Sequence, residues 1–164
     1  MSEQLVIRLG SRAEQSISWL VWASHSQEVI ASGEIAGADQ LPELAVRLGG
    51  RPVVALVPAS DVVLKQVNLP AKPNRQLLQA LPYMLEEEQA EDIEKLFLAL
   101  GSTEQHDGQY SQQVAVCQHQ RMQQWLSWLQ EAGFSVSRML PDALLLPEQQ
   151  PHRVRQPDVI FRIR

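Results

Sequence analysis

The sequence lacks several features that would point to an oxidising compartment or a membrane. Cys117 is the only cysteine among 164 residues, which excludes an internal disulfide and fits a reducing compartment such as the cytoplasm. No apolar run approaches the roughly 20 residues that a membrane-spanning helix needs. The first residues, MSEQLVIRLG, do not combine a basic start with a long apolar region, which argues against a signal peptide. We therefore expect a soluble chain with no membrane span.

Positive charge is also scarce. Fourteen Lys and Arg face 19 Asp and Glu, so the formal net charge is -5. A nucleic-acid partner is not expected, because phosphate contacts need a basic face. The exception is the end of the chain, where four arginines against Asp158 give the last 14 residues a charge of +3 and leave -8 on the first 150. We expect residues 147–164 to form a basic, proline-containing, poorly ordered tail.

Sequence motifs for catalysis or cofactor binding are missing. The phosphate-binding patterns GxxxxGK and GxGxxG are absent, and so is the nucleophile pattern GxSxG. Cys117 and His119 would share one face of a predicted strand, but no other Cys or His lies near them in the sequence. The remaining histidines fall in predicted loops. The sequence therefore predicts no enzyme, no cofactor and no metal site.

The pattern of residues 1–60 predicts one compact α/β unit. Apolar and β-branched residues indicate strands over 4–9, 16–23 and 28–36. A helix is expected over 38–50, capped by Asp39 and ended by Gly49 and Gly50. The continuous apolar run at 51–58 indicates a buried strand. The predicted order is β-β-β-α-β.

Residues 61–146 show a second pattern of predicted strands and helices. Strands are expected at 62–70, 93–101, 110–119 and 134–140, with a polar turn at 102–109. One helix is expected over 73–92, with a kink or a fresh start at Pro82, and another over 120–133, ending at Gly133. The order β-α-β-β-α-β is that of a split βαβ, or ferredoxin-like, unit. The predicted fold class is thus α/β (α+β), with subdomains 1–60 and 61–146.

Six acidic residues crowd the nine positions from Glu86 to Glu94. On a helix, Glu87, Glu91 and Glu94 would form one negative stripe at i, i+4 and i+7. A solvated helix end is the simpler interpretation. However, like charges at this spacing repel and acids oppose the dipole at a helix C-terminus, so local stability does not favour the pattern. A basic partner surface would explain it, and we take Glu86, Glu87, Glu91 and Glu94 as candidate partner-binding residues.

Three stretches resemble a known family: WLVWASHSQEVIASGEI, VVALVPASDVVLKQVNLP and RQLLQALPYMLEEEQAEDIEKL. They are similar to the cytoplasmic N-terminal region of the type II secretion system protein L of Gram-negative bacteria, the inner-membrane platform component. The resemblance covers residues 1–146, and LPYMLEEEQAEDIE is its most specific part.

The resemblance implies both a fold and a function. The fold is actin-like, with a ribonuclease-H-like subdomain followed by a smaller inserted α/β subdomain. The implied function is that of a non-catalytic adaptor at the cytoplasmic face of the bacterial inner membrane. It recruits the secretion ATPase by binding the N-terminal domain of that enzyme, contacts other inner-membrane platform components and forms a homodimer.

One position departs from the actin-like pattern. Actin-like nucleotide sites place an Asp two residues before a Gly in the first hairpin, whereas here Arg8 precedes Gly10. This loss argues against hydrolysis, and a degenerate actin-like nucleotide-binding protein is the alternative hypothesis. Two other interpretations remain open. The cleft between the subdomains is as reasonable a partner site as the acidic residues, and the basic tail could touch anionic lipid headgroups.

Overall fold

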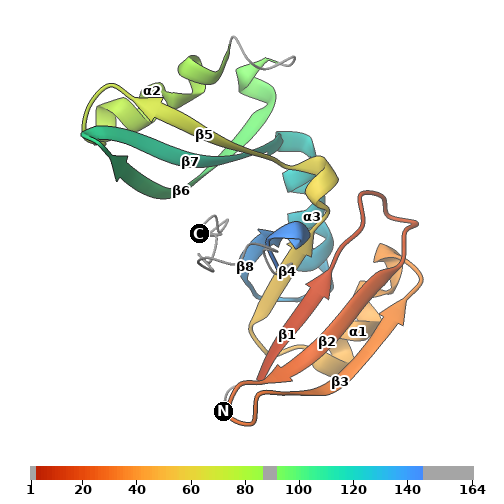
Figure 1. The fold of residues 1–164 in the computed structure, drawn as a ribbon. Coiled ribbons are helices and arrows are strands. Elements are labelled where there is room, and N and C mark those ends of the chain that lie inside the picture. The colour runs from red at the N-terminus through yellow and green to blue at the C-terminus, as the bar shows by residue number, and fades with distance from the viewer. Residues whose placement is uncertain (1–2, 87–91, 146–164) are drawn as a thin grey trace.

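The computed structural model describes residues 3–86 and 92–145. Figure 1 shows these residues as two lobes, one above the other, with helix α3 (His119–Ala132) at the junction. The larger lobe holds a five-stranded sheet of order β3-β2-β1-β4-β8, and the smaller lobe a three-stranded sheet of order β5-β7-β6. The class is mixed α/β, as the sequence predicted.

The larger lobe begins with the predicted β-β-β-α-β order. Its elements are β1 (Glu3–Arg8), β2 (Ile17–Ala23), β3 (Glu28–Ile35), α1 (Leu41–Leu48), β4 (Val53–Val57) and β8 (Val136–Pro141). The first three strands are antiparallel neighbours, whereas β4 lies parallel to both β1 and β8. Every residue of β4 is buried, as expected for a central strand.

The start of α1 differs from the prediction. Asp39 lies in a short 3-10 helix, η1 (Ala38–Gln40), and the N-cap of α1 is Gln40, whose side chain makes no capping hydrogen bond. Pro42 lies in the first turn of α1, where a missing N–H costs nothing. The helix does end at Gly49, as predicted.

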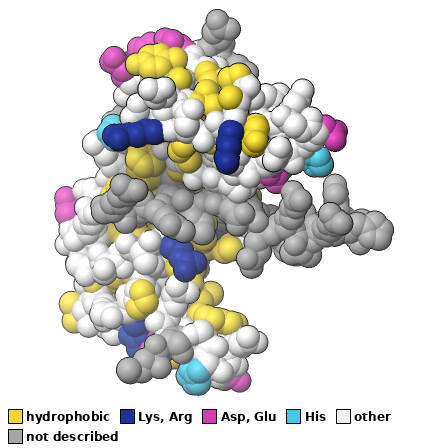
Figure 2. Space-filling view, turned by 90° about the vertical axis from the view of Figure 1, so that its left-hand side faces the viewer, with side chains coloured by type: hydrophobic (Ala, Val, Ile, Leu, Met, Phe, Trp, Pro, Cys, Tyr) yellow, Lys and Arg dark blue, Asp and Glu magenta, His cyan; other side chains and the backbone are white. Residues whose placement is uncertain are grey.

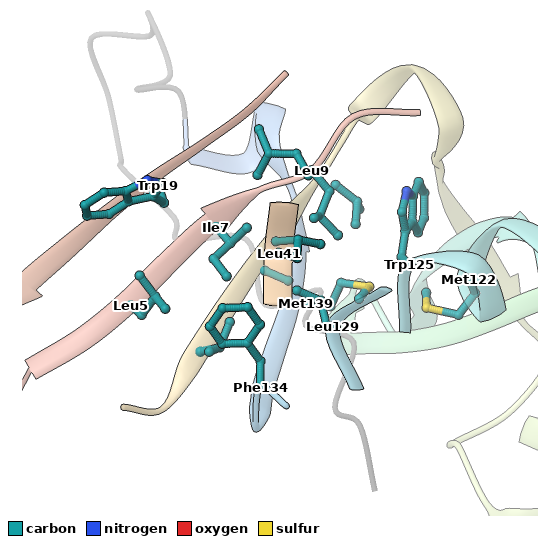
Figure 3. Close-up of a cluster of buried hydrophobic side chains, with 14 of the residues drawn as sticks. Leu5, Ile7, Leu9, Trp19, Leu41, Met122, Trp125, Leu129, Phe134 and Met139 are labelled. Atoms are coloured by element: carbon teal, nitrogen blue, oxygen red, sulfur yellow. The ribbon is translucent and has the colours of Figure 1, made fainter. Parts of the chain in front are cut away.

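The core of the larger lobe lies between the sheet and the helices α1 and α3. Alternate residues of β1 and β2 point into it, because successive side chains of a strand face opposite sides. The close-up in Figure 3 shows how helix and strand side chains meet there, among them Leu5, Ile7, Leu41, Trp125, Leu129 and Met139. All six are fully buried.

The smaller lobe is built from β5 (Val63–Leu69), α2 (Arg75–Leu85), η4 (Ile93–Lys95), β6 (Leu96–His106) and β7 (Gln109–Gln118). Its own core contains Leu69, Leu81, Leu85, Val114 and Val116. The opposite face of β7 contributes Ala115 and Cys117 to the core of the larger lobe. The two lobes therefore pack on each other.

The last helix and strand are not arranged as the ferredoxin-like expectation placed them. Strand β8 pairs with β4 in the larger sheet, and α3 packs on the larger lobe, so the smaller lobe is an insertion between β4 and α3. The physical reason is that parallel strands need a crossover helix, and α3 provides one whose apolar face is buried in the larger core. Periodicity identified β8 as a strand but could not identify its partner.

Three local predictions for the smaller lobe also need correction. Of the two predicted alternatives at Pro82, a kink or a fresh start, the fresh start is wrong, because helix α2 runs continuously from Arg75 to Leu85 with Pro82 inside it. The hairpin turn is shorter than predicted, because Asp107 and Gly108 both adopt positive φ and close a two-residue turn. His119 is the first residue of α3 and does not share a strand face with Cys117.

Candidate functional site

A polar pocket of about 420 Å³ lies at the carboxyl ends of β1, β4 and β8. In α/β sheets this edge of parallel strands is where ligands commonly bind. The β1–β2 loop contributes Gly10 and Ser11, the segment after β4 contributes Ser60, and the residue after β8 is Asp142. Arg8, the last residue of β1, lines the same pocket.

Arg8 and Asp142 form an ion pair in this pocket. The Arg8 Nη2 atom lies 3.1 Å from Asp142 Oδ2, and Arg8 Nε donates to the same oxygen at 3.2 Å. The other carboxylate oxygen, Oδ1, accepts the backbone N–H of Ala59 at 3.0 Å. Both oxygens of Asp142 are therefore engaged, and the positive charge of Arg8 stands beside the carboxylate. In residues 3–86 and 92–145 no group of three His, Cys, Asp or Glu is placed to hold a metal ion.

The β1–β2 loop is fixed to both connections between the lobes. The Ser11 hydroxyl donates to Asp61 in η2 (Ala59–Asp61), on the way out to the smaller lobe. On the returning helix α3, the Arg121 guanidinium donates to the Ser11 carbonyl oxygen, and Trp125 Nε1 donates to the Gly10 carbonyl oxygen at 3.1 Å. The pocket thus sits at the junction of the lobes.

Cys117 lies near this junction but has the properties of a core residue. Burial raises the pKa of the thiol from 9.0 to about 11, and the negative charge of Asp61 adds to the effect. A thiol with a raised pKa is a poor nucleophile, since the thiolate is the reactive form. The geometry gives Cys117 a packing role.

The four predicted partner-binding acids can be placed only in part. Glu86 caps the C-terminus of α2 and is exposed, and Glu94 is exposed in η4. Glu87 and Glu91 lie outside the described residues. Glu94 does not continue the helical register of α2, because Asp92 has an extended backbone, with φ -60° and ψ 134°, and η4 starts anew after it. The predicted single stripe on one helix is therefore wrong for Glu94.

Glu94 instead lines a second pocket, of about 360 Å³, between η4 and the start of α3. Its other lining residues include Lys95, Gln118, His119 and Gln123. The His119 ring stacks on Phe97 with 6.2 Å between ring centroids, and His119 Nε2 lies 3.2 Å from Gln123 Nε2. Amides, one acid and two basic side chains in this groove can form hydrogen bonds with a partner, but they do not make a catalytic constellation.

Two residues of functional interest escaped the sequence analysis. Asp142 pairs with a residue 134 positions away, and no local signal could reveal this. Tyr83 lies on the outer face of α2 with 70% of its surface exposed. The sequence could have revealed that Tyr83 is exposed, because it shares one helix face with polar residues. These are Gln76, Gln79 and Glu86, which lie seven, four and three positions away.

Comparison with known proteins identifies relatives over most of the chain. The family model described as "Type II secretion system (T2SS), protein L" matches residues 5–154. Type II secretion system protein L of Vibrio cholerae serotype O1 is 39% identical over 150 residues, covering 92% of this chain and 36% of that protein. The protein of the same name from Dickeya chrysanthemi is 34% identical over 148 residues, covering 88% and 35%. The chain thus spans about a third of the length of these relatives.

Solved structures give the same result for the fold. The cytoplasmic domain of EpsL, an inner membrane component of the type II secretion system of Vibrio cholerae, matches with a TM-score of 0.79 and 39% identity, over 91% of this chain and 61% of that one. The PilM-PilN type IV pilus biogenesis complex matches with a TM-score of 0.69 over 86% of this chain and 48% of that one. At 17% identity, the second match shows similarity of fold alone.

Proposed function

Because this chain belongs to the type II secretion system protein L family, a component of that secretion system, we propose that it is a non-catalytic adaptor holding the secretion ATPase at the inner-membrane platform. The observation that carries the proposal is the family match over residues 5–154. The adaptor binds the N-terminal domain of the cognate ATPase and contacts other inner-membrane platform components. It acts at the cytoplasmic face of the inner membrane as a homodimer. No helix among the described residues is long and apolar enough to cross a membrane.

The pocket at the strand ends supports a role without catalysis. The resemblance to actin-like sites calls for an acid where Arg8 stands, and Arg8 is paired with Asp142 at 3.1 Å. A guanidinium at this position repels a divalent cation, and the pair occupies the carboxylate of Asp142, the only acid that lines the pocket among the described residues. The chain therefore contributes a surface to the secretion machinery, and the ATPase contributes the chemistry.

The acids after α2 are the proposed electrostatic part of that surface. Glu86 and Glu94 are both exposed. The nearby cation Lys95 is paired with a different acid, since its Nζ atom lies 3.8 Å from Asp92 Oδ2. Glu87 and Glu91 extend the same acidic segment in the sequence. Opposed charges steer association and suppress wrong partners, so we propose that these four acids face a basic surface of the ATPase domain.

Size-exclusion chromatography with light scattering tests the adaptor function. The chain is run alone, then mixed with the purified N-terminal domain of the cognate secretion ATPase. We expect a dimer alone and a larger, co-eluting complex after mixing. A folded chain that elutes unchanged beside the ATPase domain would contradict the proposal, and a compact monomer would contradict its homodimeric part.

Residual nucleotide binding is the second candidate function, and the pocket of about 420 Å³ is the observation that favours it. Its serine hydroxyls and the Arg8 guanidinium suit a phosphate better than a metal ion. Thermal unfolding with and without ATP and Mg²⁺ distinguishes nucleotide binding from the adaptor function. The adaptor proposal predicts no shift of the melting temperature, whereas a rise that saturates with ATP concentration would favour the alternative.

A further inference from the structure

The outer face of α2 carries an apolar group that the fold does not use. Leu81 and Leu85 point into the core of the smaller lobe, with 1% and 3% of their surfaces exposed. Tyr83 points to the opposite side of the helix and is 70% exposed, and its neighbour Met84, between that side and the buried one, is 38% exposed. Ala80, three positions before Tyr83 and four before Met84, is half-buried beside them. These three residues, Ala80, Tyr83 and Met84, form what we call the α2 apolar patch.

The α2 apolar patch is not explained by the stability of the helix. Tyr has a lower helix propensity than the Gln residues that occupy the same face at 76 and 79. No hydrogen bond, ion pair or ring contact of the Tyr83 side chain occurs within residues 3–86 and 92–145. An exposed Tyr beside an exposed Met is instead typical of an interface centre, where aromatic residues and Met are enriched.

The charge around the α2 apolar patch selects the chemistry of its partner. Glu86 lies three positions after Tyr83 and two after Met84, and the last turn of α2 contains no basic residue. The C-terminal carbonyl groups of a helix add a partial negative charge at the same end. Figure 2 shows acidic side chains next to hydrophobic ones at the top of the smaller lobe. The potential is therefore negative where the apolar surface is exposed.

We infer that the α2 apolar patch is the anchor by which this chain binds a basic protein surface containing an apolar pocket, with Tyr83 inserted in that pocket. The inference rests on the proposed function, and the occupant is the N-terminal domain of the secretion ATPase. Burial of an aromatic side chain supplies binding energy and slows dissociation, while the rim acids mainly raise the association rate. The two parts of the surface thus have separate kinetic signatures.

The test measures association and dissociation rates of the immobilised ATPase N-terminal domain with the purified chain. Tyr83→Ala should weaken binding at least tenfold, mainly through faster dissociation, and Tyr83→Phe should keep most of the affinity because the ring remains. Val46→Ala is the matched control, since Val46 is 88% exposed on α1 in the other lobe. Thermal unfolding of each variant confirms that it folds, which we expect for side chains so exposed.

The outcomes separate the two proposals. If the unmodified chain binds and only Tyr83→Ala loses affinity, the α2 apolar patch is the anchor. If the unmodified chain binds but Tyr83→Ala binds within about twofold of it, or Val46→Ala is equally impaired, the inference is overturned and the adaptor function stands. If the unmodified, folded chain does not bind, the proposed function fails and the inference fails with it.

Discussion

The Arg8 guanidinium lies 3.1 Å from the Asp142 carboxylate, although 134 residues separate the two in the sequence. Arg8 ends the first strand of the larger sheet, and Asp142 follows the last one. The ion pair therefore joins the central strand β1 to the segment that follows the edge strand β8, across the pocket. It puts a positive charge at the position where the actin-like resemblance of the sequence led us to look for an acid.

Removing each partner of this ion pair should have unequal effects on stability. Arg8→Gln should lower the free energy of unfolding by less than about 1 kcal/mol, because the guanidinium is largely exposed to solvent. Asp142→Ala should cost about 1–2 kcal/mol, because it also leaves the Ala59 N–H without its acceptor. Urea unfolding measures both. Equal effects would mean that the bond to Ala59 contributes nothing.

The thiol of Cys117 should make stability depend on pH in the alkaline range. Its pKa is about 11 in the folded chain and 9.0 ordinarily, so the proton is held more tightly in the folded state. The resulting stabilisation, on the order of 2 kcal/mol, is complete below pH 9 and lost as pH rises from 9 to 11. Denaturant unfolding between pH 8 and 11 should show this loss in the unmodified chain and not in Cys117→Ala. If the unfolding free energies of the unmodified chain and of Cys117→Ala changed with pH in the same way, the raised pKa of Cys117 would be contradicted.

Two tryptophans three positions apart on α3 should differ in importance. Trp125 is fully buried and its Nε1 donates to the Gly10 carbonyl oxygen, whereas Trp128 is half-buried. Trp125→Phe should cost about 2 kcal/mol of unfolding free energy, because it leaves a cavity and an unpaired carbonyl group. The matched variant Trp128→Phe should cost less than about 1 kcal/mol. A larger loss for Trp128→Phe than for Trp125→Phe in urea unfolding would contradict the role given to Trp125.

Charge reversal in the acidic segment should slow association with the ATPase domain without unfolding the chain. Glu87→Lys combined with Glu91→Lys should reduce the association rate about tenfold at low salt and weaken its dependence on ionic strength. Stopped-flow measurements at several salt concentrations test this. Glu43→Lys, a reversal on α1 in the other lobe, is the control. Unaltered rates and unaltered salt dependence in the double variant would remove these acids from the interface.

Most of the individual elements could be predicted from the sequence, because their patterns are local. The alternation of Leu5 and Ile7 in β1 and the uninterrupted apolar run of β4 each identify a strand by its burial. Gly133 ends α3 in the left-handed conformation, as a glycine after a helical stripe predicts. These signals need no knowledge of the rest of the chain.

The assembly of the elements could not be predicted in the same way. The partner of β8 depends on where α3 buries Trp125 and Leu129, which is a property of the folded core. The pairing of Arg8 with Asp142 depends in turn on that placement of β8. The same holds for the acids: their number was visible, but the extended backbone at Asp92 that separates Glu94 from α2 was not.

Calorimetric titration of this chain with the N-terminal domain of the cognate secretion ATPase tests the adaptor function most directly. The account predicts saturable binding that weakens as salt rises, since part of the surface is electrostatic. Such a result would show that these 164 residues contain a sufficient docking surface. No heat of binding from a chain that is folded by circular dichroism would contradict the account.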